Sequence, residues 1–160
     1  MAQFDLTDFE WSMIQPLLPT KVRGGLTTKI HAMVDANGLP IRLVLSEGQA
    51  YDGHSAHLML DTLLPGSILL ADRAYDADKL RAAIAGQGAF ANIPPMPQRV
   101  RRSAFSPFLY RYRNLIERFF NKLKHFRAVA TRYDKRDDNF LASVQLASIR
   151  IWLRHNESVT

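Results

Sequence analysis

The amino-acid sequence predicts an α/β protein with a mixed sheet flanked by helices. Segments 27–34 and 40–46 are separated by the turn sequence Asp-Ala-Asn-Gly, which predicts an antiparallel hairpin. A short apolar run at 67–71 is typical of a strand buried on both faces. Segments with apolar residues at helical spacing follow these strands, and this order of strands and helices is typical of layered α/β folds.

Capping residues and turn signals assign the first half of the chain. Thr7 is a candidate cap, acidic residues follow it, and apolar residues recur at helical spacing up to Pro19. We therefore expect an N-terminal helix within residues 1–20. After the hairpin, a helix and the 67–71 strand are expected, and Asp76 is expected to cap the next helix.

The second half is expected to be mainly helical. A short strand at 89–93 ends at two prolines, and the basic, Pro-rich segment 94–108 is expected to be an exposed arm or loop. A basic helix is predicted at 110–124, a polar turn region at 125–139, and a largely buried helix at 140–154.

Composition limits the kinds of site and the kinds of protein. The 160 residues suit a single domain and include no cysteine, which excludes disulfides and thiolate metal sites. Acidic residues near the N-terminus argue against an export signal, and no apolar run is long enough to cross a bilayer. We expect a cytoplasmic protein.

Positive charge is concentrated in the last third of the chain. Residues 1–100 carry 8 Lys or Arg against 10 Asp or Glu, whereas residues 101–160 carry 13 against 5. This asymmetry favours a nucleic-acid-binding surface. Charge that serves solubility alone is the alternative, and an anionic membrane surface is disfavoured because the basic helix needs its apolar residues for the fold.

The basic helix at 110–124 carries one acidic residue, Glu117. At about 100° per residue, Tyr110, Arg113, Glu117 and Lys124 share a stripe roughly 60° wide, while the apolar residues face mostly the other way. This arrangement can present a catalytic or metal-binding carboxylate to a polyanion. The alternative is a surface helix in which Glu117 pairs with Arg113 and Lys124.

A second carboxylate, Asp72, directly follows the 67–71 strand. Ligands in α/β folds bind at the C-terminal ends of such strands. Asp72 is therefore a candidate site residue. The alternative is a loop residue whose side chain caps or hydrogen-bonds the backbone.

Three blocks of sequence carry a resemblance to a known family. RGGLTTKIHAMVDANGLPIRLVLSEGQAYD, ADRAYDA and RYRNLIERFFNKLKHFRAVATRYDK are similar to bacterial insertion-sequence transposases of the DDE type. The resemblance points to the insertion-sequence-five group of the insertion-sequence-four class. The family signature Tyr-(2)-Arg-(3)-Glu-(6)-Lys is met by Tyr110, Arg113, Glu117 and Lys124.

The resemblance implies a ribonuclease-H-like fold over residues 21–160 and metal-dependent cleavage and strand transfer at insertion-sequence ends. Asp72 and Glu117 match catalytic, metal-binding carboxylates, with Mg²⁺ (or Mn²⁺) as cofactor. Double-stranded DNA is the implied partner, with a homo-oligomer or a full-length transposase as a further one and the nucleoid as location. The residues expected to contact DNA are Tyr110, Arg113, Lys124, Arg118, Lys122, Arg101, Arg102 and Arg132.

One part of the family pattern is missing. The first catalytic Asp of the family lies on a strand upstream of the RGGLTTKIH block, and here the predicted N-terminal helix runs almost directly into that block. We therefore expect a truncated fold that lacks its first central strand, with residues 1–20 as a helical remnant. The alternatives to an active transposase are a non-catalytic remnant that binds DNA or a full-length transposase, and an unrelated basic nucleic-acid-binding module.

Overall fold

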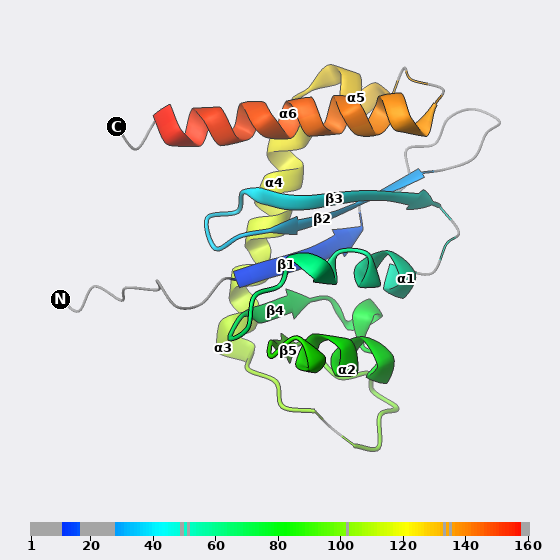
Figure 1. Cartoon of the computed structure of the whole chain (residues 1–160), viewed down its shortest axis with the longest axis vertical. Helices are drawn as coiled ribbons and strands as arrows, with labels where there is room; N and C mark the ends of the chain where they lie inside the picture. The colour runs from blue at the N-terminus through cyan, green and yellow to red at the C-terminus, as the bar shows by residue number, and fades with distance from the viewer. Residues whose placement is uncertain are drawn as a thin grey trace.

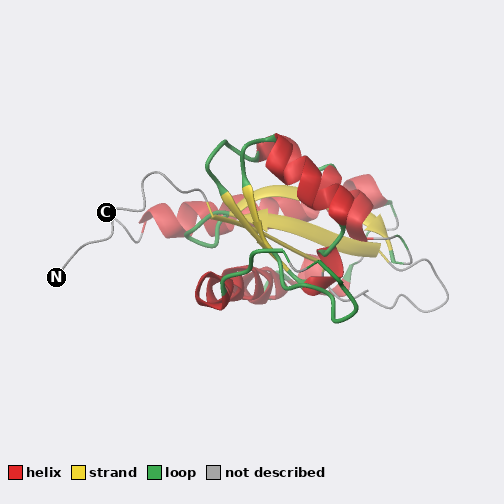
Figure 2. Cartoon of the chain, turned by 90° about the horizontal axis from the view of Figure 1, so that it is seen from below, coloured by secondary structure: helices red, strands yellow, loops and turns green. Residues whose placement is uncertain are grey.

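The structure is a computed structural model that describes residues 11–16, 28–48, 50, 52–101, 103–132, 134 and 136–157. A five-stranded sheet in the order β3-β2-β1-β4-β5 runs through it, with helices on both faces (Figures 1 and 2). The strands are β1 (Trp11–Pro16), β2 (Thr28–Val34), β3 (Pro40–Glu47), β4 (Ile68–Ala71) and β5 (Phe90–Asn92). The pairs β3-β2 and β2-β1 are antiparallel and the pairs β1-β4 and β4-β5 are parallel, which confirms the mixed sheet.

The helices form two groups, one on each face of the sheet. The helical elements are α1 (Asp52–His57), η1 (Leu60–Thr62), η2 (Arg73–Tyr75), α2 (Asp78–Gly86), α3 (Pro107–Tyr110), η3 (Arg111–Arg113), α4 (Asn114–Lys124), α5 (Arg127–Thr131) and α6 (Asp137–Glu157). Of the described elements, α1 and α2 cover one face, while α4 crosses behind the sheet and α6 packs across α4 (Figure 1). None of the described helices is long and apolar enough to span a membrane.

Alternation along β4 divides the interior into two hydrophobic cores. Leu69 and Ala71 pack with residues of α1 and α2, whereas Leu70 packs with residues of α4 and α6. Successive side chains of a strand point to opposite faces, so a strand buried on both sides must be apolar throughout. The buried strand predicted at 67–71 is confirmed, and Asp72 follows its last residue.

The prediction of an N-terminal helix is wrong for residues 11–16, which form β1 in the centre of the sheet. Met13 pairs with Val34 of β2, and Trp11 and Ile14 pair with Ile68 and Ala71 of β4. Both β2 and β4 need a partner for their backbone groups, and that demand outweighs the helical spacing of a short apolar segment. Residues 1–10 and 17–20 lie outside the described residues.

The expectation that the central strand is missing is therefore also wrong. β1 fills the position between β2 and β4, and the sheet begins before residue 20. β1 has the sequence WSMIQP, which contains no carboxylate. The strand is present, but it brings no acidic residue to the sheet.

The β2–β3 hairpin is confirmed, and its turn lies against α4. Asp35 accepts hydrogen bonds from the amides of Asn37 and Leu39 at 2.9 and 2.8 Å, which is ordinary turn chemistry. Gly38 has a φ of +75°, and a Cβ at this position would lie 3.5 Å from the carbonyl oxygen of Leu115 on α4. A Cβ at that distance would make an ordinary contact, so the positive φ of the turn is what favours glycine here.

The basic helix predicted at 110–124 is confirmed within a longer helical stretch formed by α3, η3 and α4. Ser106 caps its start by accepting a hydrogen bond from the amide of Leu109 at 3.3 Å. Four apolar residues of α4 are buried in the core: Ile116, Phe119, Phe120 and Leu123. The region predicted as a polar turn contains α5, and the last helix starts earlier than expected, at Asp137.

Candidate active site

Asp72 lies directly after β4, with its side chain turned toward α3 and η3. Its carboxylate accepts a hydrogen bond from the Tyr110 hydroxyl at 2.9 Å and is 30% exposed. Asp72 precedes the short helix η2, yet its side chain makes no capping hydrogen bond there. The alternative of a residue that caps this helix is therefore wrong, and the carboxylate bonds Tyr110 and Arg113 instead.

Glu117 reaches Asp72 through one shared partner, the guanidinium of Arg113. Arg113 donates to Glu117 Oε1 at 2.6 Å and to Asp72 Oδ2 at 3.3 Å, and its Nε lies 3.2 Å from Asp72 Oδ1. Because a single guanidinium contacts both carboxylates, the two acids lie within reach of one cation. The Glu117 side chain is 47% exposed, so this side of the pair is open to solvent.

Tyr110 completes the cluster as a donor. Its hydroxyl hydrogen-bonds Asp72, and the Arg113 guanidinium lies 5.6 Å from the centre of its ring. Burial raises the pKa of Tyr110 to about 12, and the hydrogen bond to the Asp72 carboxylate adds to the shift. Tyr110 is therefore protonated at neutral pH and holds the Asp72 carboxylate in place.

The stripe predicted on the basic helix is only partly joined by contacts. Tyr110, Arg113 and Glu117 share the cluster with Asp72. Lys124 lies exposed at the end of α4, and in the described part of the chain no ion pair joins it to Glu117. The pairing of Glu117 with Arg113 at i,i+4 spacing is real, but Arg113 also reaches Asp72, which a simple surface pair does not explain.

The two carboxylates fit a divalent cation in their chemistry. Carboxylate oxygens are the ligands that Mg²⁺ and Mn²⁺ prefer, and both acids already contact one cationic group, the guanidinium of Arg113. The described residues contain no cluster of three His, Cys, Asp or Glu side chains that could hold a metal ion. Any further ligand must come from water, from DNA or from outside the described residues.

A hollow of about 620 Å³ opens beside Asp72. It is lined by residues that follow β4 and by the segment leading into α3: Asp72, Arg73, Ala74, Pro94, Phe105, Pro107 and Tyr110. Phe105 and Tyr110 meet edge to face with their ring centres 5.4 Å apart. Asp72 is thus approachable from this side as well as from the side of Glu117.

The remaining basic residues predicted to contact DNA have different surroundings. Arg118 and Lys122 are exposed on α4, and Arg101 is exposed on the segment after β5. Arg102 lies outside the described residues. The prediction for Arg132 is wrong, because its side chain is only 7% exposed, pairs with Asp137 and lies over the ring of Phe140 at 4.7 Å.

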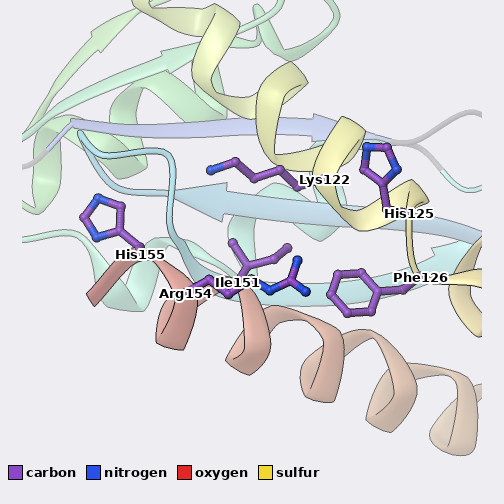
Figure 3. A pocket seen from close by; sticks show the side chains of 6 residues that line it. All are labelled: Lys122, His125, Phe126, Ile151, Arg154 and His155. Atoms are coloured by element: carbon purple, nitrogen blue, oxygen red, sulfur yellow. The ribbon is translucent and has the colours of Figure 1, made fainter. Parts of the chain in front are cut away.

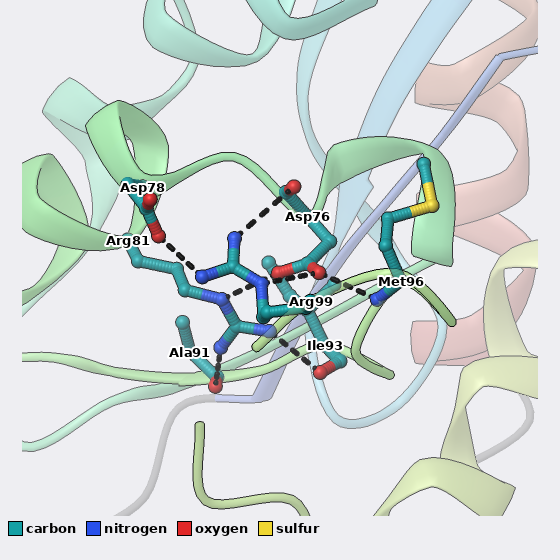
Figure 4. A network of polar contacts seen from close by, with 7 residues as sticks. All are labelled: Asp76, Asp78, Arg81, Ala91, Ile93, Met96 and Arg99. Atoms are coloured by element: carbon teal, nitrogen blue, oxygen red, sulfur yellow. Dashed lines mark hydrogen bonds and ion pairs between the residues drawn. The ribbon is translucent and has the colours of Figure 1, made fainter. Parts of the chain in front are cut away.

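Sequence reasoning missed a buried ion network next to the site. The Asp76 carboxylate is fully buried and accepts from Arg81 Nε and Arg99 Nε, both at 2.8 Å, and from the Met96 amide at 2.7 Å (Figure 4). Burial alone would raise the pKa of Asp76, but these hydrogen bonds outweigh burial and lower it. Asp76 was expected to cap a helix, yet α2 begins after Ala77 without a side-chain cap.

The segment 94–108, predicted as an exposed arm or loop, is a loop up to α3, and the same network fastens its start. Arg99 binds both Asp76 and Asp78, and Arg81 donates to the carbonyl oxygens of Ala91 and Ile93. These contacts fasten the start of the segment to α2 and β5. The sequence offers one local sign of this network, the short spacing of Asp76 and Arg81, because Arg99 lies 23 residues from Asp76.

Comparison with protein families matches residues 20–152 to the transposase DDE domain. The chain is 44% identical over 130 residues to the putative transposase for insertion sequence element IS6501 of Brucella ovis, covering 81% of this chain and 100% of that protein. It is 29% identical over 122 residues to the putative transposase for insertion sequence element IS402 of Burkholderia cepacia, covering 69% of this chain and 56% of that protein.

Two solved structures resemble the fold. The catalytic core domain of BIV integrase has a TM-score of 0.55 at 16% identity, covering 87% of this chain and 80% of that chain. A chain of the simian T-cell lymphotropic virus intasome has a TM-score of 0.54 at 12% identity, covering 88% and 46%. These likenesses confirm the ribonuclease-H-like fold, while the insertion-sequence-five group stays a prediction.

Proposed function

The chain belongs to the DDE transposase family, and we propose that it cuts and joins DNA at insertion-sequence ends with Asp72 and Glu117 as its metal-binding carboxylates. Members of this family are DNA transposases that depend on divalent metal ions. The observation that carries the proposal is the contact of one guanidinium, that of Arg113, with both carboxylates. We propose Mg²⁺ as the metal, with Mn²⁺ as an alternative.

The reaction is an in-line displacement at phosphorus. A nucleophilic hydroxyl, from water or a 3′ end, loses its proton to solvent and forms a bond to phosphorus. The bond to the leaving 3′ oxygen breaks, and that oxygen takes up a proton from solvent to become a hydroxyl. When bound, the metal ion supplies Lewis-acid stabilisation of the oxygens around the phosphorus. Asp72 and Glu117 would hold it, and Tyr110 keeps the Asp72 carboxylate oriented through its 2.9 Å hydrogen bond.

Arg113 has a distinct part in this proposal. In the protein alone it neutralises the two carboxylates, and its planar fork suits phosphate oxygens equally well. DNA and metal binding would therefore exchange its partners: the carboxylates take the metal, and the guanidinium takes a phosphate. Metal binding to the carboxylates releases Arg113 for DNA, and DNA binding by Arg113 frees the carboxylates for the metal. Each binding event therefore favours the other.

The remaining contacts would be electrostatic. The exposed side chains of Lys124, Arg118, Lys122 and Arg101, with Arg102, would bind backbone phosphates, and affinity should fall steeply with salt. The partners proposed are double-stranded DNA at the ends and target, and a second transposase chain. A DNA substrate of this kind implies the bacterial nucleoid, in the cytoplasm, as the place of action.

The proposal is tested by strand cleavage of a duplex that carries the terminal repeat flanking the gene, with Mg²⁺ present. The unaltered chain should nick the duplex, and Asp72→Asn and Glu117→Gln should each reduce the rate at least 100-fold. Asp61→Asn is the matched control, because Asp61 is an exposed carboxylate paired with Arg42 away from the site. Binding without any cleavage by the unaltered chain would refute the proposal and identify a non-catalytic DNA-binding member of the family.

A further inference from the structure

A second feature of the surface lies between the last turn of α4 and the C-terminal turns of α6. The pocket has a volume of about 490 Å³ and is lined by six residues: Lys122, His125, Phe126, Ile151, Arg154 and His155. Figure 3 shows Lys122 and the Arg154 guanidinium reaching into the space between the two helices, with Phe126 and Ile151 beside them. Of its six lining residues, only Lys122 has a part in the proposed function, as a contact to backbone phosphate.

The lining of the pocket is rich in basic side chains. Four of its six lining residues are basic and none is acidic. Among the described residues, no ion pair or side-chain hydrogen bond engages Lys122, His125 or Arg154. Lys122 and Arg154 are both cations on the lining of one pocket, so an anion bound here would be stabilised.

Helix ends account for part of this charge but not for all of it. The C-terminus of a helix carries roughly half a negative charge, so α4 and α6 together offset about one positive charge. Lys122 and Arg154 alone bring two, and two imidazoles lie beside them. The positive charge that the helix ends do not offset is the reason to expect an external anion in the pocket.

The position of Lys122 separates this pocket from the carboxylates. Lys122 is five residues beyond Glu117 on α4, which places it about 140° further around the helix and about 7.5 Å along it. A DNA segment bound at Asp72 and Glu117 faces a different side of α4. The pocket therefore suits a second DNA segment rather than the phosphodiester that is cut.

We infer that this pocket binds backbone phosphate of a DNA segment other than the one held at Asp72 and Glu117. The inference rests on the proposed function, since it takes DNA as the substrate. Arg154 supplies a fork of donors that matches phosphate oxygens, and Lys122 supplies a mobile point charge. Because all its donors address the backbone, the pocket contributes affinity without sequence preference.

The five histidines of the chain give a direct readout. His125 and His155 line the pocket, whereas His31, His54 and His57 lie in β2 and α1. Titration of the full chain with a 20-base-pair duplex of arbitrary sequence, followed by histidine side-chain NMR, should move the signals of His125 and His155. The signals of His54 and His57 should stay in place.

Charge reversal then tests the contribution to affinity. Arg154→Glu and Lys122→Glu should each weaken duplex binding about tenfold and lower the slope of log affinity against log salt by about 1. Lys79→Glu, on the exposed face of α2, removes the same charge on the other side of the sheet and should change affinity much less.

The outcomes separate this inference from the proposed function. A chain that cleaves DNA while His125 and His155 stay fixed at saturating duplex would overturn the pocket alone. Equal effects of Lys79→Glu and Arg154→Glu would overturn it too, because they would indicate general charge attraction. A chain that does not cut, yet shifts both histidines and loses affinity in Arg154→Glu, would support the pocket and refute the cleavage.

Discussion

Replacement of Asp76 by Asn should destabilise the protein strongly. The carboxylate is fully buried and accepts three hydrogen bonds at 2.7–2.8 Å, two of them from guanidiniums whose side chains are 12% and 15% exposed. Removing one partner of a buried ion pair costs about 3–5 kcal/mol. The lower figure applies here, because Arg81 keeps two carbonyl partners and Arg99 keeps Asp78. For a domain of this size about 3 kcal/mol corresponds to roughly 6–12 °C in Tm.

The assay is thermal and urea unfolding followed by circular dichroism. Asp138→Asn is the matched control, since Asp138 forms an ion pair with Arg136 in which both side chains are mostly exposed, and such pairs contribute little. The two variants lose the same charge. A Tm of Asp76→Asn within about 2 °C of the control would refute the structural role assigned to the network.

The Asp76 network also sets a pH dependence. The pKa of Asp76 in the folded protein lies below its unfolded value of about 3.9, so the network's stabilisation is fully present above that pH and is lost as pH falls through the folded pKa. Asp76→Asn should therefore lose less stability than the unaltered chain when the pH is lowered below about 4. Parallel pH profiles for the two chains would contradict this account.

Three further predictions concern the site and its supports. The raised pKa of Tyr110 implies a stabilisation that is present below about pH 10 and is lost as the pH rises toward 12. Urea unfolding of Tyr110→Phe should therefore show a shallower loss of stability at alkaline pH than the unaltered chain. An unchanged profile would argue against the hydrogen bond to Asp72. Gly38→Ala should lower the free energy of unfolding by about 1–2 kcal/mol in the same assay, because Gly38 has a positive φ. Gly86→Ala is the control and should not destabilise the protein, because there is open space around Gly86. Equal effects would exclude strain at the turn. Ile14 of β1 pairs with Ala71 of β4, so Gln15 and Asp72 are the residues that follow this pair in sequence. Gln15→Asp should raise Mn²⁺ affinity about tenfold by calorimetry. An unchanged affinity would separate this position from the metal site.

The parts of the site that depend on local sequence could be predicted. Asp72 follows a short apolar strand, and Glu117 lies among cations on an amphipathic helix, so the pattern around each residue was sufficient. Arg113 was identified as part of a family signature, but its contact with Asp72 joins residues 41 positions apart, and no local pattern encodes it. The bridge between the carboxylates follows only from how η3 and α4 pack beside β4.

The errors have a common physical origin in long-range partners. Residues 11–16 have helical spacing, yet two strands that need backbone partners draw them into the sheet. Asp76 stands where a cap is expected, yet Arg99, 23 residues later, provides a stronger partner than the helix backbone does. Arg132 was expected to contact DNA, but its side chain is enclosed by Asp137 and Phe140.

The central claim is that Asp72 and Glu117 form one cation-binding site in which Arg113 stands as the resident cation. Mn²⁺ binding to the DNA-free protein, measured by electron paramagnetic resonance, tests this claim without requiring catalysis. Arg113→Gln leaves two carboxylates without their shared cation, so it should bind Mn²⁺ about tenfold more tightly than the unaltered chain. The double variant Asp72→Asn, Glu117→Gln should lose that binding. Unchanged affinity in Arg113→Gln, or retained binding in the double variant, would contradict the account.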